Sequence, residues 1–321
     1  MTKSLSLDLY KKLYLIRCAE KAIIENYPTD AMKTPMHMSM GEEAIVVGVC
    51  QGLGVNSQTF GTYRSHALYL ASTADSDGFF AEMYGKKTGI VKGKGGSMHL
   101  SYPEKGLMAT SAVVASTIPV AVGSAYANKY QKNGKIVAVF FGDGAVDEGV
   151  FWESLNIACL MKLPIVFICE DNGYAVHTKT AKRHGYKSIT KIIKQFDCEV
   201  ISSESTDVEE IYKISQKAVN LVKKGKRPVF LYLKYYRYLE HVGVGWDFDA
   251  GYRSKTEFNK WLRKDPILLQ KKRILKKGIS EGYLTKIENL IANQLEKSIQ
   301  RAKKSSFPAS SEVLENVFYE T

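Results

Sequence analysis

The most constraining feature of this chain is a strand-like run that ends in a tight acidic corner. Residues 135–141, KIVAVFF, are apolar and rich in β-branched and aromatic residues with no helical stripe, which is typical of a strand buried on both faces of a parallel sheet. A Gly-Asp-Gly corner follows, and from Phe151 apolar residues recur at helical spacing. In open α/β sheets ligands bind where the strands end, and glycines there let the backbone turn sharply. Asp143 is therefore predicted to lie in a strand-to-helix crossing at a ligand-binding edge.

The corner has a simpler interpretation, in which Gly-Asp-Gly is only a turn and Asp143 caps the next helix. It is neither a Walker loop nor the spaced triple-glycine fingerprint of dinucleotide-binding folds. However, a second strand-like run, residues 164–169, ends in EDNGYAVHT, which places Asn172 at a neighbouring strand end. A carboxylate, an amide oxygen and free backbone carbonyls suit Mg²⁺, which usually completes its shell with phosphates.

The rest of the chain alternates strands with helices. A strand is predicted over residues 228–236, and helices are predicted over residues 4–26, within 37–53, over 116–131 and from Thr206, where Thr206 and Glu209 match a capping box. This order predicts an α/β fold, a parallel sheet with helices on both faces. We expect one domain over residues 1–252 and a helical C-terminal extension of that domain, with a short tail, over residues 253–321.

The net charge of +12 raises nucleic-acid binding as a rival hypothesis. Many lysines fall in residues 260–304, where apolar residues recur at helical intervals: Leu268, Leu269, Ile274, Leu290, Ile291 and Leu295. That pattern predicts surface helices with lysines outward, and no aromatic stacking pattern supports RNA binding. An acidic partner subunit is the better functional alternative. No secretory signal or long uncharged apolar stretch is present, so we expect a soluble, cytoplasmic protein with no membrane partner.

Five sequence blocks together point to one family. They are HMSMGEEAIVVGV from His37, GTYRSHALYL from Gly61, GKGGSMHL from Gly93, Gly-Asp-Gly followed after 27 residues by Asn172, and YYRYLEH from Tyr235. The fourth block matches the thiamine-diphosphate-binding motif. In this order the blocks resemble the alpha subunit of the first component of thiamine-diphosphate-dependent 2-oxo acid dehydrogenases (pyruvate, branched-chain and acetoin dehydrogenase type). The resemblance runs from about Leu5 to Arg253, with a weaker tail.

The resemblance implies roles for individual residues. It implies that Mg²⁺ is bound by Asp143, Asn172 and the backbone carbonyl of Tyr174, and that His37 and His241 are catalytic histidines near the substrate channel and on a mobile loop. The residues implied to bind thiamine diphosphate are Tyr63, Arg64, Ala112, Val114, Gly142, Asp143, Gly144, Ala145, Asn172, Arg237 and His241. Arginines suit this task because a guanidinium presents a donor fork to phosphate oxygens.

Three segments bear on how far the resemblance extends. Where pyruvate-type sequences have Gly-Ile-Val-Gly, this chain has AVVA (residues 112–115), and alanine fits that backbone if the local φ is negative. Leu239 precedes the loop histidine, and the serines that pyruvate-type chains carry there are missing, so regulation by their phosphorylation is not supported. GKGGSMHL invites a phosphate-loop interpretation, but a tight loop by the pocket mouth is preferred because the Gly-Asp-Gly corner already serves the diphosphate.

The resemblance implies oxidative decarboxylation of a small-molecule 2-oxo acid, with acyl transfer to a lipoyl group of an acyltransferase. Only the diphosphate half of a cofactor site is present, so a separate beta subunit is implied, in an α₂β₂ heterotetramer. Two alternatives stay open. One is a two-subunit carboligase or non-oxidative decarboxylase with a non-lipoyl acceptor, such as a sugar-derived aldehyde, and the other is a cofactor-free scaffolding subunit.

Overall fold

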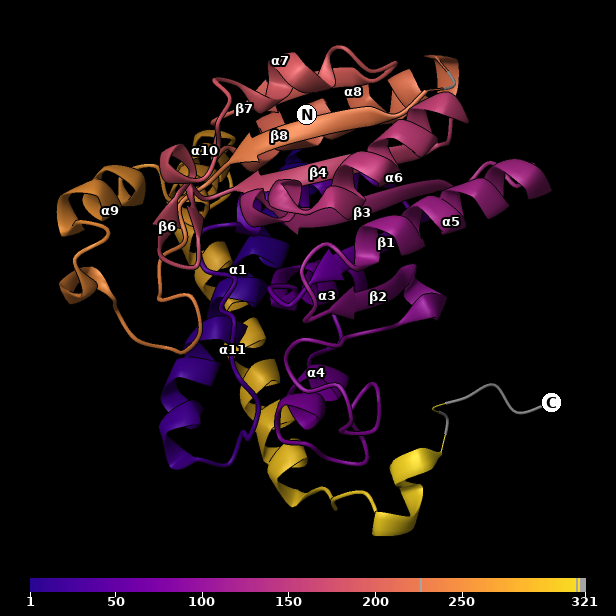
Figure 1. Ribbon diagram of the computed structural model, residues 1–321. Helices are drawn as coiled ribbons and strands as arrows, with labels where there is room; N and C mark the ends of the chain where they lie inside the picture. The colour runs from indigo at the N-terminus through magenta and orange to yellow at the C-terminus, as the bar shows by residue number, and fades with distance from the viewer. Residues whose placement is uncertain (226, 316, 318–321) are drawn as a thin grey trace.

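A six-stranded parallel sheet forms the centre of the computed structural model, which describes residues 1–225, 227–315 and 317 (Figure 1). The strand order is β2-β1-β3-β4-β8-β7. The strands are β1 (Ser57–Thr62), β2 (Leu107–Ser111), β3 (Ile136–Gly142), β4 (Ile165–Asp171), β7 (Glu199–Ser203) and β8 (Val229–Lys234). A separate two-stranded antiparallel hairpin joins β5 (Tyr174–Ala175) to β6 (Thr178–Lys179). The predicted parallel sheet is confirmed.

Helices cover both faces of the sheet, as predicted. The helices are α1 (Lys3–Asn26), α2 (Glu43–Leu53), α3 (His66–Thr73), α4 (Ser76–Met83), α5 (Thr117–Gln131), α6 (Gly149–Leu160), α7 (Ile189–Ile193), α8 (Val208–Gly225), α9 (Lys255–Leu262), α10 (Pro266–Lys276) and α11 (Glu281–Lys304). Side chains of α5, α6 and α7 pack in one apolar core, and those of α1, α2 and α8 pack in the other. Helices α5 and α6 lie in front of the strands in Figure 1.

Strand β3 shows why its sequence is apolar at every position. Val137, Val139 and Phe141 belong to the core beneath α5 and α6, whereas Ile136, Ala138 and Phe140 belong to the opposite core. Successive side chains of a strand point to opposite faces, so a strand covered on both faces buries all of them. This packing fixes the end of β3, and with it the Gly-Asp-Gly corner, at the carboxyl edge of the sheet.

The C-terminal helices return to the beginning of the chain. Helix α11 runs beside α1 and α4 (Figure 1), and its Leu295 and Ile299 share the apolar core of α1. Two of the apolar residues predicted to face inward do not: Leu268 and Leu290 are 61% and 68% exposed. The boundary at residues 252/253 stays a prediction, and the end of the predicted tail, residues 318–321, lies outside the described residues.

The predicted capping box at the start of α8 is wrong. Asp207 caps this helix, because its Oδ1 accepts from the backbone N–H groups of Glu209 (2.9 Å) and Glu210 (3.4 Å). The Thr206 hydroxyl instead donates to the carbonyl of Lys264. The Glu209 carboxylate accepts from the hydroxyl of Ser6 and the amide of Gln270. Both box residues therefore bind distant segments, a use that local spacing does not show.

Within the described part of the chain, every helix is too short or too polar to cross a membrane. A cytoplasmic location stays a prediction.

Candidate active site

The Gly-Asp-Gly corner is built where β3 ends. Gly142 closes the strand, Asp143 opens a short 3₁₀ turn that ends at Asp147, and α6 begins at Gly149. Asp143 does not cap α6, so the simple-turn interpretation is wrong on that point. Asp143 is 2% exposed, and its Oδ2 accepts from the Thr180 hydroxyl at 3.1 Å and from Arg183. The other oxygen, Oδ1, is buried with no hydrogen-bond partner among the residues that the structure describes.

Asn172 and Tyr174 follow the end of the adjacent strand β4. The side-chain oxygen of Asn172 accepts from the backbone N–H of Tyr174 (3.0 Å), and its amide donates to the Tyr235 hydroxyl (3.1 Å). Asp143, Asn172 and Tyr174 line one cavity of about 270 Å³, which also has Tyr63, Arg64, Val114, Gly142, Gly144, Ala145 and His241 in its wall. Parallel strands that end at one edge explain why these distant residues meet.

A divalent cation fits the Asp143 carboxylate. Burial raises the pKa of Asp143 to about 6, and the nearby charge of Asp171 adds to the rise while Arg183 opposes it. An unpartnered buried carboxylate oxygen is costly unless a cation or donor reaches it. No group of three or more His, Cys, Asp or Glu side chains in the described ranges could hold a metal. A metal here would therefore use the mixed oxygen set of Asp143, Asn172 and the Tyr174 carbonyl, which suits Mg²⁺.

Arg64 and His241 are part of the wall of this cavity, and His37, which is not, packs against Tyr63 and His241. The ring of His37 lies 4.5 Å from that of Tyr63 and 5.4 Å from that of His241, measured between centroids. The Arg64 guanidinium donates to the carbonyls of Met38 (2.8 Å) and His241 (3.2 Å). These contacts hold the segment before α2 against the loop that carries His241.

Both of these histidines are neutral at physiological pH. Burial, followed by the nearby positive charge of Arg64, lowers the pKa of His37 and that of His241 to about 3. His37 Nδ1 is buried and has no protein partner in the described segments. The imidazoles can therefore accept or donate a hydrogen bond here, but they do not titrate near pH 7 in this structure.

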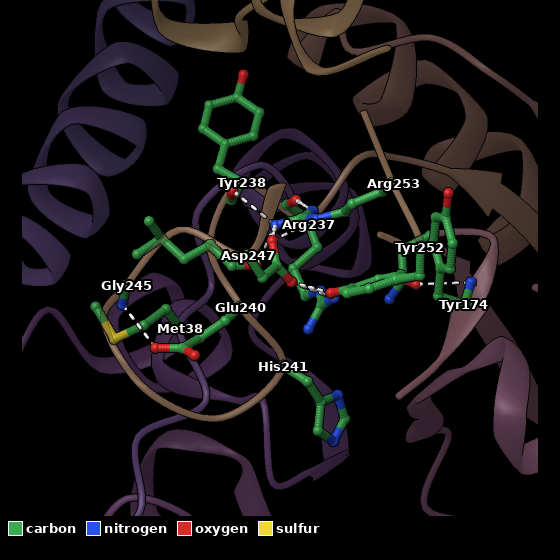
Figure 2. A network of polar contacts seen from close by, with 12 residues as sticks. Met38, Tyr174, Arg237, Tyr238, Glu240, His241, Gly245, Asp247, Tyr252 and Arg253 are labelled. Atoms are coloured by element: carbon green, nitrogen blue, oxygen red, sulfur yellow. Dashed lines mark hydrogen bonds and ion pairs between the residues drawn. The ribbon is translucent and has the colours of Figure 1, made fainter. Parts of the chain in front are cut away.

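Arg237 lies in a separate polar network (Figure 2). Its guanidinium donates to the Tyr252 hydroxyl (2.7 Å) and approaches Asp247 (3.5 Å), and it is not part of the wall of the Asp143 cavity. Arg253 pairs with Asp247 and donates to the carbonyls of Arg237, Tyr238 and Leu239, which holds the loop backbone. Burial, with the charges of Arg64 and Arg253, lowers the pKa of Arg237 to about 10. Figure 2 shows the His241 imidazole pointing away from this cluster.

Asp247, Tyr252 and Arg253 were not anticipated from the sequence. The signal for them is the stretch WDFDAGYR, in which an acid, an aromatic residue and an arginine follow a glycine-rich loop. The loop has a second closure, because Glu240 accepts from the N–H of Gly245 (2.8 Å) and donates its own N–H to the Gly245 carbonyl (3.0 Å). His241 is thus carried by a loop that is fixed at both ends.

Two buried glutamates in the cavity wall were also missed. Glu42 and Glu170 line the same cavity as Asp143, and each has an Oε1 atom without a partner in the described parts of the chain. Burial, against the attraction of Arg64, raises the pKa of Glu42 to about 8, and burial together with Glu42 raises that of Glu170 well above its usual range. Each glutamate stands within a block that the sequence had singled out, GEEA and EDNGYAVHT.

Comparison with known proteins gives one consistent answer. Residues 11–311 match the family model of the dehydrogenase E1 component. The chain belongs to the dehydrogenase E1 family. It is 31% identical to the alpha subunit of acetoin:2,6-dichlorophenolindophenol oxidoreductase of Bacillus subtilis, over 99% of this chain and 95% of that protein. It is 32% identical to the pyruvate dehydrogenase E1 component subunit alpha of Zymomonas mobilis, over 97% of this chain and 88% of that protein.

Membership in the E1 family confirms the resemblance drawn from the five sequence blocks and the dehydrogenase class that it implied. Thiamine diphosphate is the cofactor that this family implies. The roles of the individual site residues stay predictions, with the geometry given above.

One departure from pyruvate-type E1 chains has a structural consequence. In the AVVA segment, Val114 lines the cavity and Ala112 does not. The condition that alanine fits if φ is negative fails at Ala115, which is 3% exposed and has φ of +62°. This is the left-handed region, which glycine enters freely and alanine enters only with strain.

The glycine-rich loop of this E1 chain is a tight loop, not a phosphate loop. Its amides are already used, because the buried Glu82 carboxylate accepts from the N–H groups of Val91, Gly93, Gly95 and Gly96 at 2.7–3.1 Å. No residue from 93 to 99 lines the Asp143 cavity, so the predicted place at the pocket mouth is not where this structure puts the loop. His99 is exposed in a separate hollow.

Proposed function

We propose that this chain is the alpha subunit of a thiamine-diphosphate-dependent 2-oxo acid dehydrogenase that decarboxylates its substrate and passes the acyl group to a lipoyl arm. The observation that carries the proposal is the unpartnered, buried Oδ1 of Asp143, a residue that lines the same cavity as Asn172 and Tyr174. These three residues would hold Mg²⁺ and, through it, the diphosphate. In the alternative of a cofactor-free scaffolding subunit, this buried oxygen would stay without a partner, which is unusual for a buried polar atom.

When bound, thiamine diphosphate would supply the nucleophilic carbon and the electron sink that decarboxylation of a 2-oxo acid requires. The chain's own groups supply position and charge. Arg64 places a guanidinium in the cavity wall, where it would attract the phosphate oxygens of the cofactor. Glu42 retains a proton at neutral pH and can donate a hydrogen bond into the cavity. Neutral His37 and His241 stand on the loop side, where they can orient a substrate carboxylate or carbonyl oxygen.

A separate beta subunit would complete the site. Val113 and Val114 are 67% and 44% exposed beside the cavity. Further exposed apolar side chains follow along α5 and α6: Val120, Tyr126, Tyr130, Ile157 and Leu160. Exposed apolar residues that extend from a site along two neighbouring helices are typical of a surface that a partner covers. An α₂β₂ assembly, and delivery to a lipoyl-bearing acyltransferase, extend the proposal by resemblance.

The first experiment is calorimetric titration of thiamine diphosphate and Mg²⁺ into this chain alone and into its complex with the co-expressed beta subunit. We expect tight binding only in the complex, abolished by Asp143→Ala and unchanged by Asp197→Ala, which removes an exposed carboxylate far from the cavity. Absence of binding in both wild-type samples would refute the proposal.

The histidine loop favours a second candidate, a two-subunit carboligase or non-oxidative decarboxylase with another acceptor. Leu239 and Glu240 stand beside the histidine, and Glu240 closes the loop onto Gly245, so the loop next to the histidine departs in sequence from the pyruvate-type pattern. Relatives named for pyruvate and for acetoin match almost equally well. Acyl transfer from pyruvate or acetoin to a lipoyl domain, assayed with the complete complex, would exclude this candidate.

A further inference from the structure

The segment after β4 folds back onto the corner after β3. Following Asn172 and Tyr174, the β5–β6 hairpin returns the chain, and the N–H of Thr180 donates to the carbonyl of Gly173 (3.0 Å). Arg183 then reaches across, and its guanidinium pairs with the carboxylates of both Asp143 and Asp147. The segment that carries the predicted metal ligands Asn172 and Tyr174 therefore also binds the third predicted ligand, Asp143.

Only one of the two carboxylate oxygens of Asp143 is held by these contacts. Thr180 and Arg183 both bind Oδ2, whereas Oδ1 is buried with no partner in the described residues. Asp143 lines the cavity, but neither Thr180 nor Arg183 is part of its wall. The two donors thus hold one oxygen of the carboxylate from residues outside the cavity wall, and the second oxygen has no donor in the described residues.

We propose that Arg183 is a positioning residue of the metal site, which fixes Oδ2 of Asp143 so that Oδ1 is presented to a divalent cation. The inference rests on the proposed function, because it requires Asp143 to be a metal ligand. Outer partners that orient a metal-binding carboxylate contribute strongly to metal affinity. By joining the β3 corner to the segment after β4, Arg183 also makes Asp143, Asn172 and Tyr174 one preorganised unit.

The burial and shape of Arg183 support this role over that of an ordinary surface ion pair. Its side chain is 12% exposed, and its planar fork reaches two carboxylates of one 3₁₀ turn at once. Arg227 offers a matched comparison, because it pairs with two carboxylates, Asp197 and Glu199, but its side chain is 41% exposed and lies away from the cavity. Exposed pairs of that kind contribute little.

A competing role for Arg183, as a cation that must leave before the metal enters, is less consistent with the geometry. The guanidinium lies outside the cavity wall, and the carboxylate has a second oxygen available. The two roles predict opposite effects on metal affinity, which makes them separable by experiment.

The experiment measures Mn²⁺ binding by electron paramagnetic resonance in the alpha–beta complex with thiamine diphosphate present. The variants are Arg183→Ala, Arg183→Lys and the control Arg227→Ala. We expect Arg183→Ala to weaken Mn²⁺ binding about 10- to 100-fold, Arg183→Lys to restore part of the affinity, and Arg227→Ala to match the wild type. Melting of the metal-free complexes shows whether each variant is folded.

Each outcome bears on a distinct claim. If the wild-type complex binds no Mn²⁺, the proposed function fails; if the wild type binds and Arg183→Ala equals Arg227→Ala, only the positioning role fails. Tighter Mn²⁺ binding in Arg183→Ala would also overturn it and would establish competition instead. Should Arg183→Ala not fold, Thr180→Val removes the other donor to Oδ2 and leaves Asp147 untouched, and the positioning role then requires weaker Mn²⁺ binding in that variant.

Discussion

Two glycine-bearing loops of this chain look alike in the sequence and differ in what their polar groups do. In the loop around residues 93–99, four backbone N–H groups converge on the buried carboxylate of Glu82, and both of its oxygens are satisfied. In the Gly-Asp-Gly corner, the buried carboxylate of Asp143 has one oxygen held and one without a partner in the described structure. The amides of the first loop are paired with a carboxylate from helix α4, whereas the carboxylate of the second has one oxygen that no described residue pairs.

The difference separates a structural loop from a binding loop. Buried polar groups are normally paired, so a fully paired loop is explained by the fold alone. A buried carboxylate oxygen that stays unpaired in a cavity wall needs a reason, and a ligand supplies one. Satisfaction of polar atoms, more than glycine content, therefore distinguishes the two loops, and each substitution below tests one side of this contrast.

The largest effect is expected at Glu82. Replacing it in Glu82→Ala leaves four amides without their acceptor, and we expect a loss of about 3–5 kcal/mol in the free energy of unfolding, or failure to fold. Glu82→Gln keeps one acceptor oxygen and should lose less. Urea denaturation of the three proteins measures the difference. A loss in Glu82→Ala of less than about 1 kcal/mol would show that water replaces the carboxylate and that the loop is not held as described.

At Asp143 we expect the opposite of what is expected at Glu82: a large effect on metal binding and a small effect on the free energy of unfolding. Asp143→Asn keeps the shape of the side chain but removes the charge, so we expect metal binding to weaken at least about 100-fold while the free energy of unfolding changes by less than about 1 kcal/mol. Burial already penalises the ionised form of Asp143, and this limits what the fold loses. Metal titration and urea denaturation on the same preparation give both numbers. A large loss of stability with unchanged metal binding would place Asp143 with Glu82, among the structural carboxylates.

The sequence predicts local order well because local order has local causes. The apolar runs before Asp143 and Asn172, and the parallel sheet that brings them to one edge, follow from periodicity and alternation. Contacts between residues that are far apart in the sequence could not be predicted from periodicity or spacing. Arg183 on Asp143, Glu82 under its loop, and Glu42 beside Glu170 each join segments whose meeting no spacing rule encodes.

The start of helix α8, residues 206–209, shows that a local sequence pattern can also predict a contact that the fold does not make. Thr206 and Glu209 have the spacing of a capping box, but tertiary partners at Lys264, Ser6 and Gln270 take both side chains, and Asp207 serves as the cap. Local propensity holds only until a distant group offers a better contact.

Glu42 extends the contrast to a second carboxyl group of the cavity wall. Its folded pKa of about 8 lies above its ordinary value of 4.5, so between these pH values the unfolded chain gives up a proton that the folded chain keeps. The stability that this group contributes is therefore lost as pH rises from about 4.5 to about 8. Because Glu42→Gln cannot ionise, we expect it to be about 1–3 kcal/mol more stable than the wild type at pH 8 and equal to it at pH 4.5.

Urea denaturation of Glu42→Gln and the wild type at several pH values measures this difference. A stability gap that does not change between pH 4.5 and pH 8 would mean that Glu42 is ionised in the folded chain.

The smallest effect is expected in the AVVA segment. The unusual feature there is a strained backbone at Ala115, not an unpaired polar atom as at Asp143. Ala115 lies in the left-handed region at φ of +62°, whereas Ala112 has no positive φ. Glycine relieves the strain at residue 115 by about 1 kcal/mol but increases the entropy of the unfolded chain, so Ala115→Gly should stabilise by only about 0.5 kcal/mol. Ala112→Gly gains no relief and should destabilise by about 0.5–1 kcal/mol. The test is the opposite sign of the two changes in urea denaturation. Equal losses would mean that residue 115 leaves the left-handed region in solution, and Val114, its neighbour in the cavity wall, would then be held differently from what is described here.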